Sequence, residues 1–566
     1  MRKIINEPDR FVDEVLEGIV LAHPGAYRFA SGERRAVVDA SGPRPGQVGI
    51  VTGGGSGHLP LFLGYVGSGL VTGVAVGNVF SSPSPEVILR ATRATDGGAG
   101  VLYLYGNYGG DIYNFDLAAE MARGEGIATR TVVGTDDILS AGSDVAETRR
   151  GVAGLVLAFK VAGAAAARGD DLATVARVAA HCVSRTRTAG IGLAPTILPA
   201  AGKPTFRVDE GQMEVGIGIH GEAGIATVPL ETADQIAMRL VEHLASEISL
   251  SPGIRVAVLV NGLGATPPEE LYILFRAVHR LITASGSVVA RAFVGEYATS
   301  LEMAGASVSL LALDDDLEEL LAAPASSPFY RDGTMAADHA LDDLVPATQT
   351  GGHEPAELLR CEFESKVRQA IRAVAATWPD HADEFRQLDA ALGDGDLGIT
   401  VSAGSRAVAS LLDDLPARVA GSTLLREAGL AFASANPSTF AALVGGGLVA
   451  AATEFDDTHQ ATAREGIAIG RAAAAFVARK GGAERGDKTL LDVLVPVLDA
   501  LDTDPDDLER AASLAWELVS STAQLQSRRG RAAWHQDRSI GLRDPGSVAV
   551  AYLLDTLLRG RDSMNT

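Results

Sequence analysis

A change of pattern near residue 332 divides the chain and constrains its fold more than any other feature. Before it, short β-branched runs alternate with helical patterns. After it, helices rich in Ala, Leu, Arg and Glu continue with almost no alternating strand pattern. The segment 332–353 is poor in large apolar residues, as interdomain linkers are. The pattern predicts an α/β region at 1–331, a linker at 332–353 and an all-α region at 354–566.

The α/β region shows repeated strand, turn and helix signals. The run VAVLV is followed by the turn NGLG and by PPEELYILFRAVHRLI, with Pro and Glu at the start of a helix. Strands are predicted at 48–51, 100–106, 128–134, 256–260 and 287–295. The stretch GIGLAPTILPAAGKP interrupts this pattern near residue 200. We therefore expect two α/β subdomains that meet near residue 200.

Composition excludes several classes of protein. With 47% hydrophobic and 21% charged residues, the 566-residue chain has enough apolar material to fold. Its formal charge, 48 minus 71 or −23, disfavours nucleic-acid and anionic membrane partners. Its 2 cysteines suit a reducing compartment, and neither a signal peptide nor a run of about 18 apolar residues is present. We expect a cytoplasmic protein with no nucleic-acid or membrane partner.

The first of three glycine-rich motifs in the α/β region is GGGSGH. Gly53–Gly55 precede His58 in this motif. Such glycines let backbone N–H groups approach a polar ligand, but a tight strand-to-helix turn explains them equally well. The motif lacks the Lys-Ser/Thr ending of a phosphate-binding P-loop, so it does not by itself identify a ligand.

The other two motifs each contain one titratable residue. In NYGGD, Asp111 follows a predicted strand, where open α/β sheets bind ligands; the alternative is that Asp111 caps the next helix. In GIHGE, His220 lies in a strand-like apolar stretch between Gly218 and Gly221. These glycines leave the imidazole sterically open, although an isolated histidine is more often a buried one satisfied by its neighbours.

Three carboxylates of the all-α region lie close together in LDAALGDGDLG. We expect Asp389 at the end of a helix, and the glycines around Asp394 and Asp396 let the chain turn so that the three groups meet. Carboxylates repel one another unless a cation joins them, and hard oxygen ligands suit Mg²⁺ or Ca²⁺. The glutamate that ends an EF-hand loop is replaced by Ser405. The motif therefore predicts a metal site of another kind.

Three further segments of the all-α region contain hydroxyls, glycines and basic residues. Around a metal ion these groups suit polyphosphate binding, whereas capped helices and ordinary turns are the alternative. The segments are NPSTFAALVGGG with Ser438 and Thr439, RGDKTLLD, and GRAAWHQDRSIGLRDPGS.

The order of these motifs resembles the ATP-dependent dihydroxyacetone kinases over nearly the whole chain. The shared order is GGGSGH, NY-x-GD, GIHGE, a linker, D-x3-GDGD and a late DPG. The resemblance implies a ketose-binding α/β half and a barrel of α-helices that binds ATP with two Mg²⁺ ions. It also implies transfer of the γ-phosphoryl group to a terminal hydroxyl of a short-chain ketose, by a homodimer.

The resemblance assigns roles to individual residues. His220 resembles the family histidine whose nitrogen adds to the substrate carbonyl as a hemiaminal, and Asp111 the aspartate that accepts the hydroxyl proton. His58 and the amide around Gly55 look like the groups that hydrogen-bond the substrate oxygens. The Mg²⁺ carboxylates are matched by Asp389, Asp394 and Asp396. Nucleotide contacts are implied for Thr400, Ser438, Thr439, Gly486, Asp544, Pro545 and Gly546.

Two departures from the family pattern concern the ketose pocket. Leu59–Leu63 replaces polar side chains with apolar ones, and Gly106 stands where many members have Lys. Loss of a long cationic side chain opens room or removes one hydroxyl contact. We therefore expect the tetrose erythrulose as substrate, with dihydroxyacetone as second choice. The alternatives are a ketose-binding sensor or coregulator, and a kinase subunit that depends on the phosphotransferase system.

Overall fold

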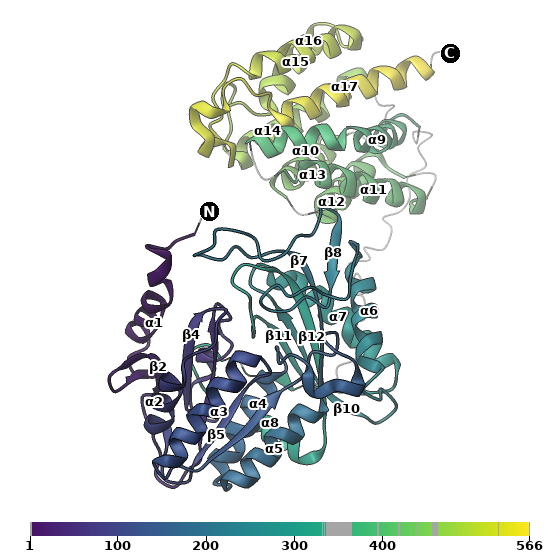
Figure 1. Cartoon of the computed structure of the whole chain (residues 1–566). Coiled ribbons are helices and arrows are strands. Elements are labelled where there is room, and N and C mark those ends of the chain that lie inside the picture. Colours follow the sequence, from purple (N-terminus) through teal and green to yellow (C-terminus); the bar gives the residue numbers. More distant parts are fainter. Residues whose placement is uncertain are drawn as a thin grey trace. The chain divides into compact units, whose positions relative to one another are not determined.

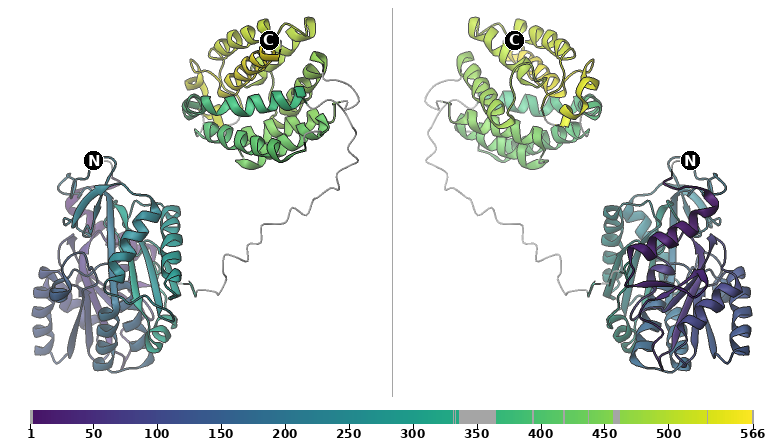
Figure 2. Two further views of the ribbon diagram at one scale, coloured as in Figure 1. Left: turned by 90° about the vertical axis from the view of Figure 1, so that its right-hand side faces the viewer. Right: turned by 90° about the vertical axis from the view of Figure 1, so that its left-hand side faces the viewer.

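The computed structural model divides the chain into two compact units, Met1–Val345 and Pro346–Thr566 (Figures 1 and 2). It describes residues 3–330, 332, 334–335, 365–392, 395–416, 419–436, 438–455, 462–529 and 531–564. The predicted linker lies outside the described residues except at 332, 334 and 335, so its bounds stay a prediction. Each unit is described by itself.

The first sheet of unit one has six strands, four of them parallel. They are β1 (Tyr27–Ala30), β2 (Glu33–Asp39), β3 (Gly49–Ser56), β4 (Gly73–Val79), β5 (Val101–Gly106) and β6 (Thr129–Gly134), in the order β1-β2-β4-β3-β5-β6. Strands β3 to β6 run parallel, and the β1–β2 hairpin joins β4 antiparallel. The segments that follow β3, β5 and β6 therefore start at one edge of the sheet, where ligands bind in open α/β folds.

The second sheet has seven strands and is mostly antiparallel. They are β7 (Thr186–Ala194), β8 (Gln212–Val215), β9 (Ala226–Pro229), β10 (Arg255–Gly262), β11 (Val288–Gly295), β12 (Ala304–Ala312) and β13 (Thr334–Met335), in the order β13-β11-β10-β12-β7-β8-β9. All five strands predicted from the sequence are present, as β3, β5, β6, β10 and β11. The second sheet begins with β7, so the chain leaves the first sheet before Thr186.

Helices pack on both sheets of unit one (Figure 1). They are α1 (Phe11–Ala22), α2 (Pro85–Thr95), α3 (Gly109–Gly124), α4 (Leu155–Arg168), α5 (Leu172–Arg185), α6 (Ala233–Ala245), α7 (Pro268–Ala284) and α8 (Asp315–Ala322), with 3₁₀ turns η1 (Pro8–Arg10), η2 (Leu63–Tyr65) and η3 (Ser143–Thr148). Helix α4 is apolar on nearly every face and is buried, as such helices must be. Its side chains share one core with residues of both sheets, which makes unit one a single packed body.

The described part of unit two is helical throughout. Its helices are α9 (Ser365–Thr377), α10 (Ala382–Leu392), α11 (Leu397–Asp414), α12 (Gly421–Ala435), α13 (Thr439–Ala452), α14 (Ala463–Gly481), α15 (Leu491–Thr503), α16 (Leu508–Thr522) and α17 (Pro545–Met564), with 3₁₀ turns η5 (Trp378–His381) and η6 (Arg531–Ser539). Helices α11 to α17 pack in sequence, and α9 packs on both α11 and α17, which closes a ring around an apolar core (Figure 2). The α/β and helical-barrel architecture that the sequence predicts is therefore confirmed.

None of the helices in the described ranges has both the length and the apolar character that a membrane span requires.

Candidate active site

Gly53–Gly55 of GGGSGH belong to strand β3 and form no turn into a helix, so the strand-to-helix interpretation of these glycines is wrong. A Cβ added at Gly55 would lie 2.6 Å from the Ser81 nitrogen and 2.7 Å from the Phe80 Cα. One added at Gly53 would lie 2.7 Å from the Ala75 carbonyl oxygen. Glycine is required here because neighbouring backbone approaches the strand closely.

His58 follows β3 and is buried, with 1% of its surface exposed. Its Nδ1 lies 2.8 Å from the carbonyl oxygen of Thr299. Because a carbonyl only accepts hydrogen bonds, Nδ1 carries the proton and Nε2 carries a lone pair. Burial and the neighbouring His220 lower the pKa of His58 to about 3. The ring is therefore neutral, and its buried Nε2 has no partner in the described part of the chain.

His220 lies in a turn between β8 and β9, which corrects the strand-like placement expected from the sequence. Its Nδ1 lies 2.8 Å from Glu222 Oε1, and its amide donates to Oε2 of the same carboxylate at 2.9 Å. The carboxylate therefore keeps the imidazole proton on Nδ1 and leaves a lone pair on Nε2. The imidazole side chain is 22% exposed.

Aromatic rings surround His220 and bring it close to His58. The His220 ring centroid lies 4.8 Å from those of His58 and Tyr108 and 5.2 Å from that of Phe80. Phe80 also stacks on His58 at 4.8 Å. The structure thus joins two histidines that lie in separate sequence motifs, at the junction of the two sheets.

Asp111 lies in the first turn of α3 and is 6% exposed. The N-cap of this helix is Tyr108, so the alternative that Asp111 caps the helix is wrong. Burial raises the pKa of Asp111 to about 6, although a hydrogen bond from Ser82 and the nearby His220 counteract it. Its Oδ1 is buried without a partner among the residues described.

Three residues near His220 each have a buried polar atom without a partner among the described residues: His58 Nε2, Asp111 Oδ1 and the Tyr108 hydroxyl. A buried polar atom without a partner costs about 1–3 kcal/mol, so such a group indicates a site for a polar ligand. Sequence reasoning found the two histidines and the aspartate. It assigned no role to Tyr108 or Glu222, although both stand inside the quoted motifs NYGGD and GIHGE.

The structure revises the argument for a roomier pocket. A Cβ added at Gly106 would lie 3.0 Å from the Gly151 oxygen and 3.1 Å from the Tyr108 ring. The space that the absence of a side chain at Gly106 was expected to open is therefore occupied. Only the other expected effect, the loss of one contact to a substrate hydroxyl, stays a prediction. Leu61, Phe62 and Leu63 are buried in the core of unit one.

In unit two, two of the three predicted metal carboxylates lie within the described residues. Asp389 is in the last turn of α10, and its Oδ2 accepts from the Leu397 amide at 3.2 Å. Asp396 directly precedes α11, and burial and the charge of Asp389 raise its pKa. Asp394 lies outside the described residues. Two carboxylates that repel each other are a donor set that fits Mg²⁺.

Thr400, Ser438 and Thr439 lie together near Asp396. Thr400 is one turn further along α11, and its Oγ1 lies 3.1 Å from Ser438 Oγ and accepts from Asn436 Nδ2 at 2.7 Å. Ser438 caps α13 and Thr439 begins it, whereas Asn436 was not predicted. The glycine run at 445–447 lies inside α13, against α12 and α14, so it serves helix packing and not a phosphate loop.

Gly486, Asp544, Pro545 and Gly546 form a second group. The Ser547 hydroxyl donates to the Thr489 carbonyl at 3.0 Å and so joins the segment after Gly486 to the DPG turn. Asp544 accepts from the Ser547 amide at 2.6 Å at the start of α17. The structure therefore places the two predicted nucleotide segments side by side.

Comparisons with known proteins agree with this arrangement. The family model described as Dak1 domain matches residues 17–329, and the one described as DAK2 domain matches residues 391–559. The chain belongs to the dihydroxyacetone kinase family. As a member of this family it is a carbohydrate kinase.

Relatives of the dihydroxyacetone kinase family match over the whole chain. An L-erythrulose 1-kinase of Mycolicibacterium smegmatis is 39% identical over 98% of this chain and 99% of that protein. A D-erythrulose kinase of the same organism is 37% identical over 98% of each. The solved structure of the dihydroxyacetone kinase from C. freundii in complex with AMP-PNP and Mg²⁺ has a TM-score of 0.63 and 28% identity over 99% of both chains. ATP and Mg²⁺ are thus ligands of the family.

Replacement of a carboxylate in unit two should weaken Mg²⁺-dependent nucleotide binding. We expect Asp389→Asn to lower the affinity for AMP-PNP with Mg²⁺ by at least about tenfold, because one hard anionic ligand is lost. Isothermal titration calorimetry with and without Mg²⁺ measures this. Asp499→Asn, which removes an exposed carboxylate paired with Arg471, is the matched control. Unchanged affinity in Asp389→Asn would contradict the metal assignment.

Proposed function

We propose that this chain phosphorylates a terminal hydroxyl of a short-chain ketose that it holds as a hemiaminal on His220. One observation carries the proposal. The His220 imidazole donates its Nδ1 proton to Glu222, which leaves a lone pair on Nε2, and the nearby His58 and Asp111 each have a buried acceptor atom without a partner among the described residues. A nucleophile next to empty hydrogen-bond positions suits a polyhydroxy carbonyl compound.

The covalent step selects for a carbonyl group. The Nε2 lone pair forms a bond to the carbonyl carbon, the C=O π pair moves to oxygen, and that oxygen takes up a proton from solvent. The imidazole becomes a cation, which the Glu222 carboxylate stabilises at 2.8 Å. Glycerol offers no carbon for this attack. The bond also fixes the remaining hydroxyls relative to the protein, which lowers the entropic cost of the transfer step.

His58 and Asp111 act on the substrate hydroxyls. His58 is neutral, so its Nε2 accepts a hydrogen bond from one of them, and the amide around Gly55 donates to another substrate oxygen. Asp111 accepts the proton of the terminal hydroxyl as this oxygen attacks phosphorus. Its pKa of about 6 lies near neutrality. A general base with such a pKa is largely ionised at neutral pH and still binds a proton strongly enough to remove it from a hydroxyl.

Unit two supplies the nucleotide site in this proposal. Asp389, Asp394 and Asp396 would hold two Mg²⁺ ions, which would neutralise charge on the phosphates of ATP. Hydroxyls and amides of two groups contact the nucleotide: Thr400, Ser438, Thr439, Gly486, Asp544, Pro545 and Gly546. A nucleotide unit in the same chain supports direct use of ATP over dependence on the phosphotransferase system. The carboxylate pair disfavours a sensor without turnover. The homodimer and the cytoplasmic location stay predictions.

The proposed substrate is erythrulose, with dihydroxyacetone second. The names of the two Mycolicibacterium smegmatis relatives support the tetrose. We expect kcat/KM to be at least about tenfold higher for erythrulose than for dihydroxyacetone, which corresponds to about 1.4 kcal/mol of preferential transition-state binding. Coupled ADP-release assays with each ketose, and with glycerol as the negative control, measure this. A preference for dihydroxyacetone would refute the tetrose assignment.

Two variants should separate covalent capture of the ketose from transfer of the phosphoryl group. We expect His220→Ala to lose the mass increase of one bound ketose in native mass spectrometry, because the nucleophile is gone. Asp111→Asn should keep the adduct but lose at least about 100-fold in kcat, because its amide accepts no proton. Asp116→Asn, an exposed aspartate on the same helix, should behave as wild type. Near wild-type turnover in Asp111→Asn would disprove the base role.

Activity should depend on the ionisation of Asp111. Its pKa is raised to about 6, so the carboxyl is protonated at lower pH and then accepts no proton. We expect kcat at saturating ketose and MgATP to fall about tenfold per pH unit below this value and to level off above it. Initial rates between about pH 5 and pH 8 test this, with circular dichroism to verify folding. A flat profile through pH 6 would contradict the assignment.

A further inference from the structure

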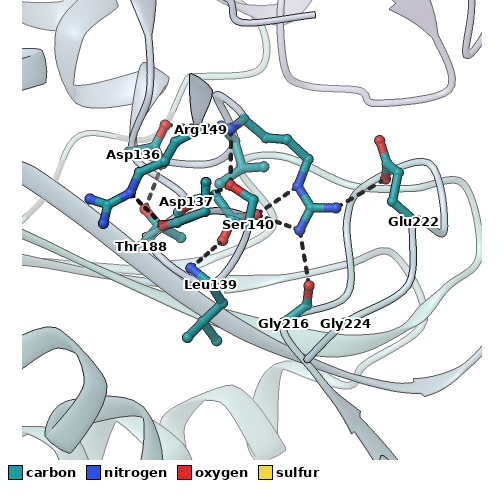
Figure 3. Close-up of polar contacts among 12 residues, drawn as sticks. Asp136, Asp137, Leu139, Ser140, Arg149, Thr188, Gly216, Glu222 and Gly224 are labelled. Carbon is teal, nitrogen blue, oxygen red and sulfur yellow. Dashed lines mark hydrogen bonds and ion pairs between the residues drawn. The ribbon is translucent and has the colours of Figure 1, made fainter. Parts of the chain in front are cut away.

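The carboxylate that orients His220 is itself held by an arginine. Arg150 Nη1 lies 3.8 Å from Glu222 Oε2, and the arginine side chain is 13% exposed. Asp137, Gly216 and Glu222 lie close together (Figure 3), and the Arg150 guanidinium group contacts all three. His220 is therefore the end of a chain of alternating charges and hydrogen bonds.

Arg150 is fixed independently of Glu222. Its Nε donates to Asp137 Oδ2 at 2.9 Å, and its Nη2 donates to the Gly216 carbonyl at 3.0 Å. The Asp137 amide also donates to the Arg150 carbonyl at 3.0 Å. Asp137 follows β6 of the first sheet, whereas Gly216 begins the loop that carries His220. One guanidinium group thus ties the His220 loop to the opposite sheet.

Gly218 provides the space for this contact. A Cβ at this position would overlap both the Glu222 carboxylate and the Arg150 guanidinium group. Gly221, on the other side of the histidine, admits Thr205, whose Cβ would lie 2.6 Å from an added Cβ. The glycines of GIHGE therefore admit the side chains that fix the loop, in addition to leaving the imidazole open.

Arg150 also helps to keep Glu222 ionised. Burial raises the pKa of this carboxyl, but the hydrogen bond and charge of His220 together with the charge of Arg150 lower it to about 2. Glu222 is therefore anionic at neutral pH and accepts the Nδ1 proton of the histidine. A carboxylate released from the guanidinium group would be free to rotate away from the ring.

We propose that Arg150 is a positioning residue for the reaction: it holds Glu222 in the orientation that keeps the His220 proton on Nδ1 and Nε2 free to attack the ketose. The inference rests on the proposed hemiaminal. Because Arg150 acts before the covalent bond forms, its loss should slow ketose capture and leave nucleotide affinity unchanged.

The test compares Arg150→Met with Arg187→Met in the full chain. Arg187 also pairs with a glutamate, Glu247 at 2.7 Å, but Glu247 does not hold the histidine. We expect Arg150→Met to lower kcat/KM for the ketose and the rate of adduct formation at least about tenfold, with KM for ATP unchanged. Arg187→Met should match wild type. A wild-type rate of adduct formation in Arg150→Met would overturn the inference.

A spectroscopic readout separates positioning from general damage. In ¹⁵N-histidine-labelled protein, His220 should show a protonated Nδ1 in wild type and a mixture of both tautomers in Arg150→Met. An unchanged tautomer would overturn the inference. Two further variants apply if Arg150→Met does not fold. Arg150→Lys keeps the charge but lacks the planar fork that reaches Asp137 and Glu222 together, and Gly218→Ala pushes the pair apart. Both should slow capture.

The outcomes distinguish this inference from the proposed function. If wild type captures no ketose and His220→Ala still turns over, the hemiaminal proposal itself fails. If wild type captures the ketose and both Arg150→Lys and Gly218→Ala capture it at the wild-type rate, the hemiaminal stands and only the role of Arg150 is refuted.

Discussion

The candidate ketose site depends on hydrogen bonds between two backbone segments that come from different sheets. The Leu301 amide donates to the Gly57 carbonyl at 2.7 Å, and the Thr299 amide donates to the His58 carbonyl at 3.2 Å. Thr299 then uses its own carbonyl to accept the Nδ1 proton of His58. The same contacts that join the sheets therefore decide which nitrogen of His58 is left to accept from a ligand.

The two histidines are oriented by the same kind of hydrogen bond, but to different acceptors. Each donates its Nδ1 proton to a fixed acceptor, a carbonyl for His58 and the Glu222 carboxylate for His220. A carbonyl orients the ring but stabilises a positive charge weakly, and burial keeps His58 neutral. A carboxylate stabilises the imidazolium that the proposed carbonyl addition would create. The chemistry of the partner thus explains why His220 suits the nucleophile and His58 suits the hydrogen-bond acceptor.

Local patterns in the sequence predicted the helices and strands, but they could not predict the contacts between these elements. Apolar runs predicted β3 and β10 because strand formation follows side-chain pattern over a few residues. The meeting of His58 with His220, and of Arg150 with Glu222, depends on how two sheets pack, and no local pattern encodes that. A tight turn stayed open as an alternative for the glycines of β3 because the reason for them, the Phe80 backbone beside Gly55, is distant in sequence. The role of Asp394 stays a prediction.

The covalent capture that we propose would also explain how one scaffold can serve ketoses of different length. The proposed bond to His220 requires a carbonyl group and makes no demand on the number of carbons beyond it. Length is instead limited by the walls of the site, which here include the rings of Phe80 and Tyr108. An apolar wall discriminates one carbon by only about 1–3 kcal/mol. Small changes in these rings can therefore alter the preference among ketoses while the requirement for a carbonyl is retained.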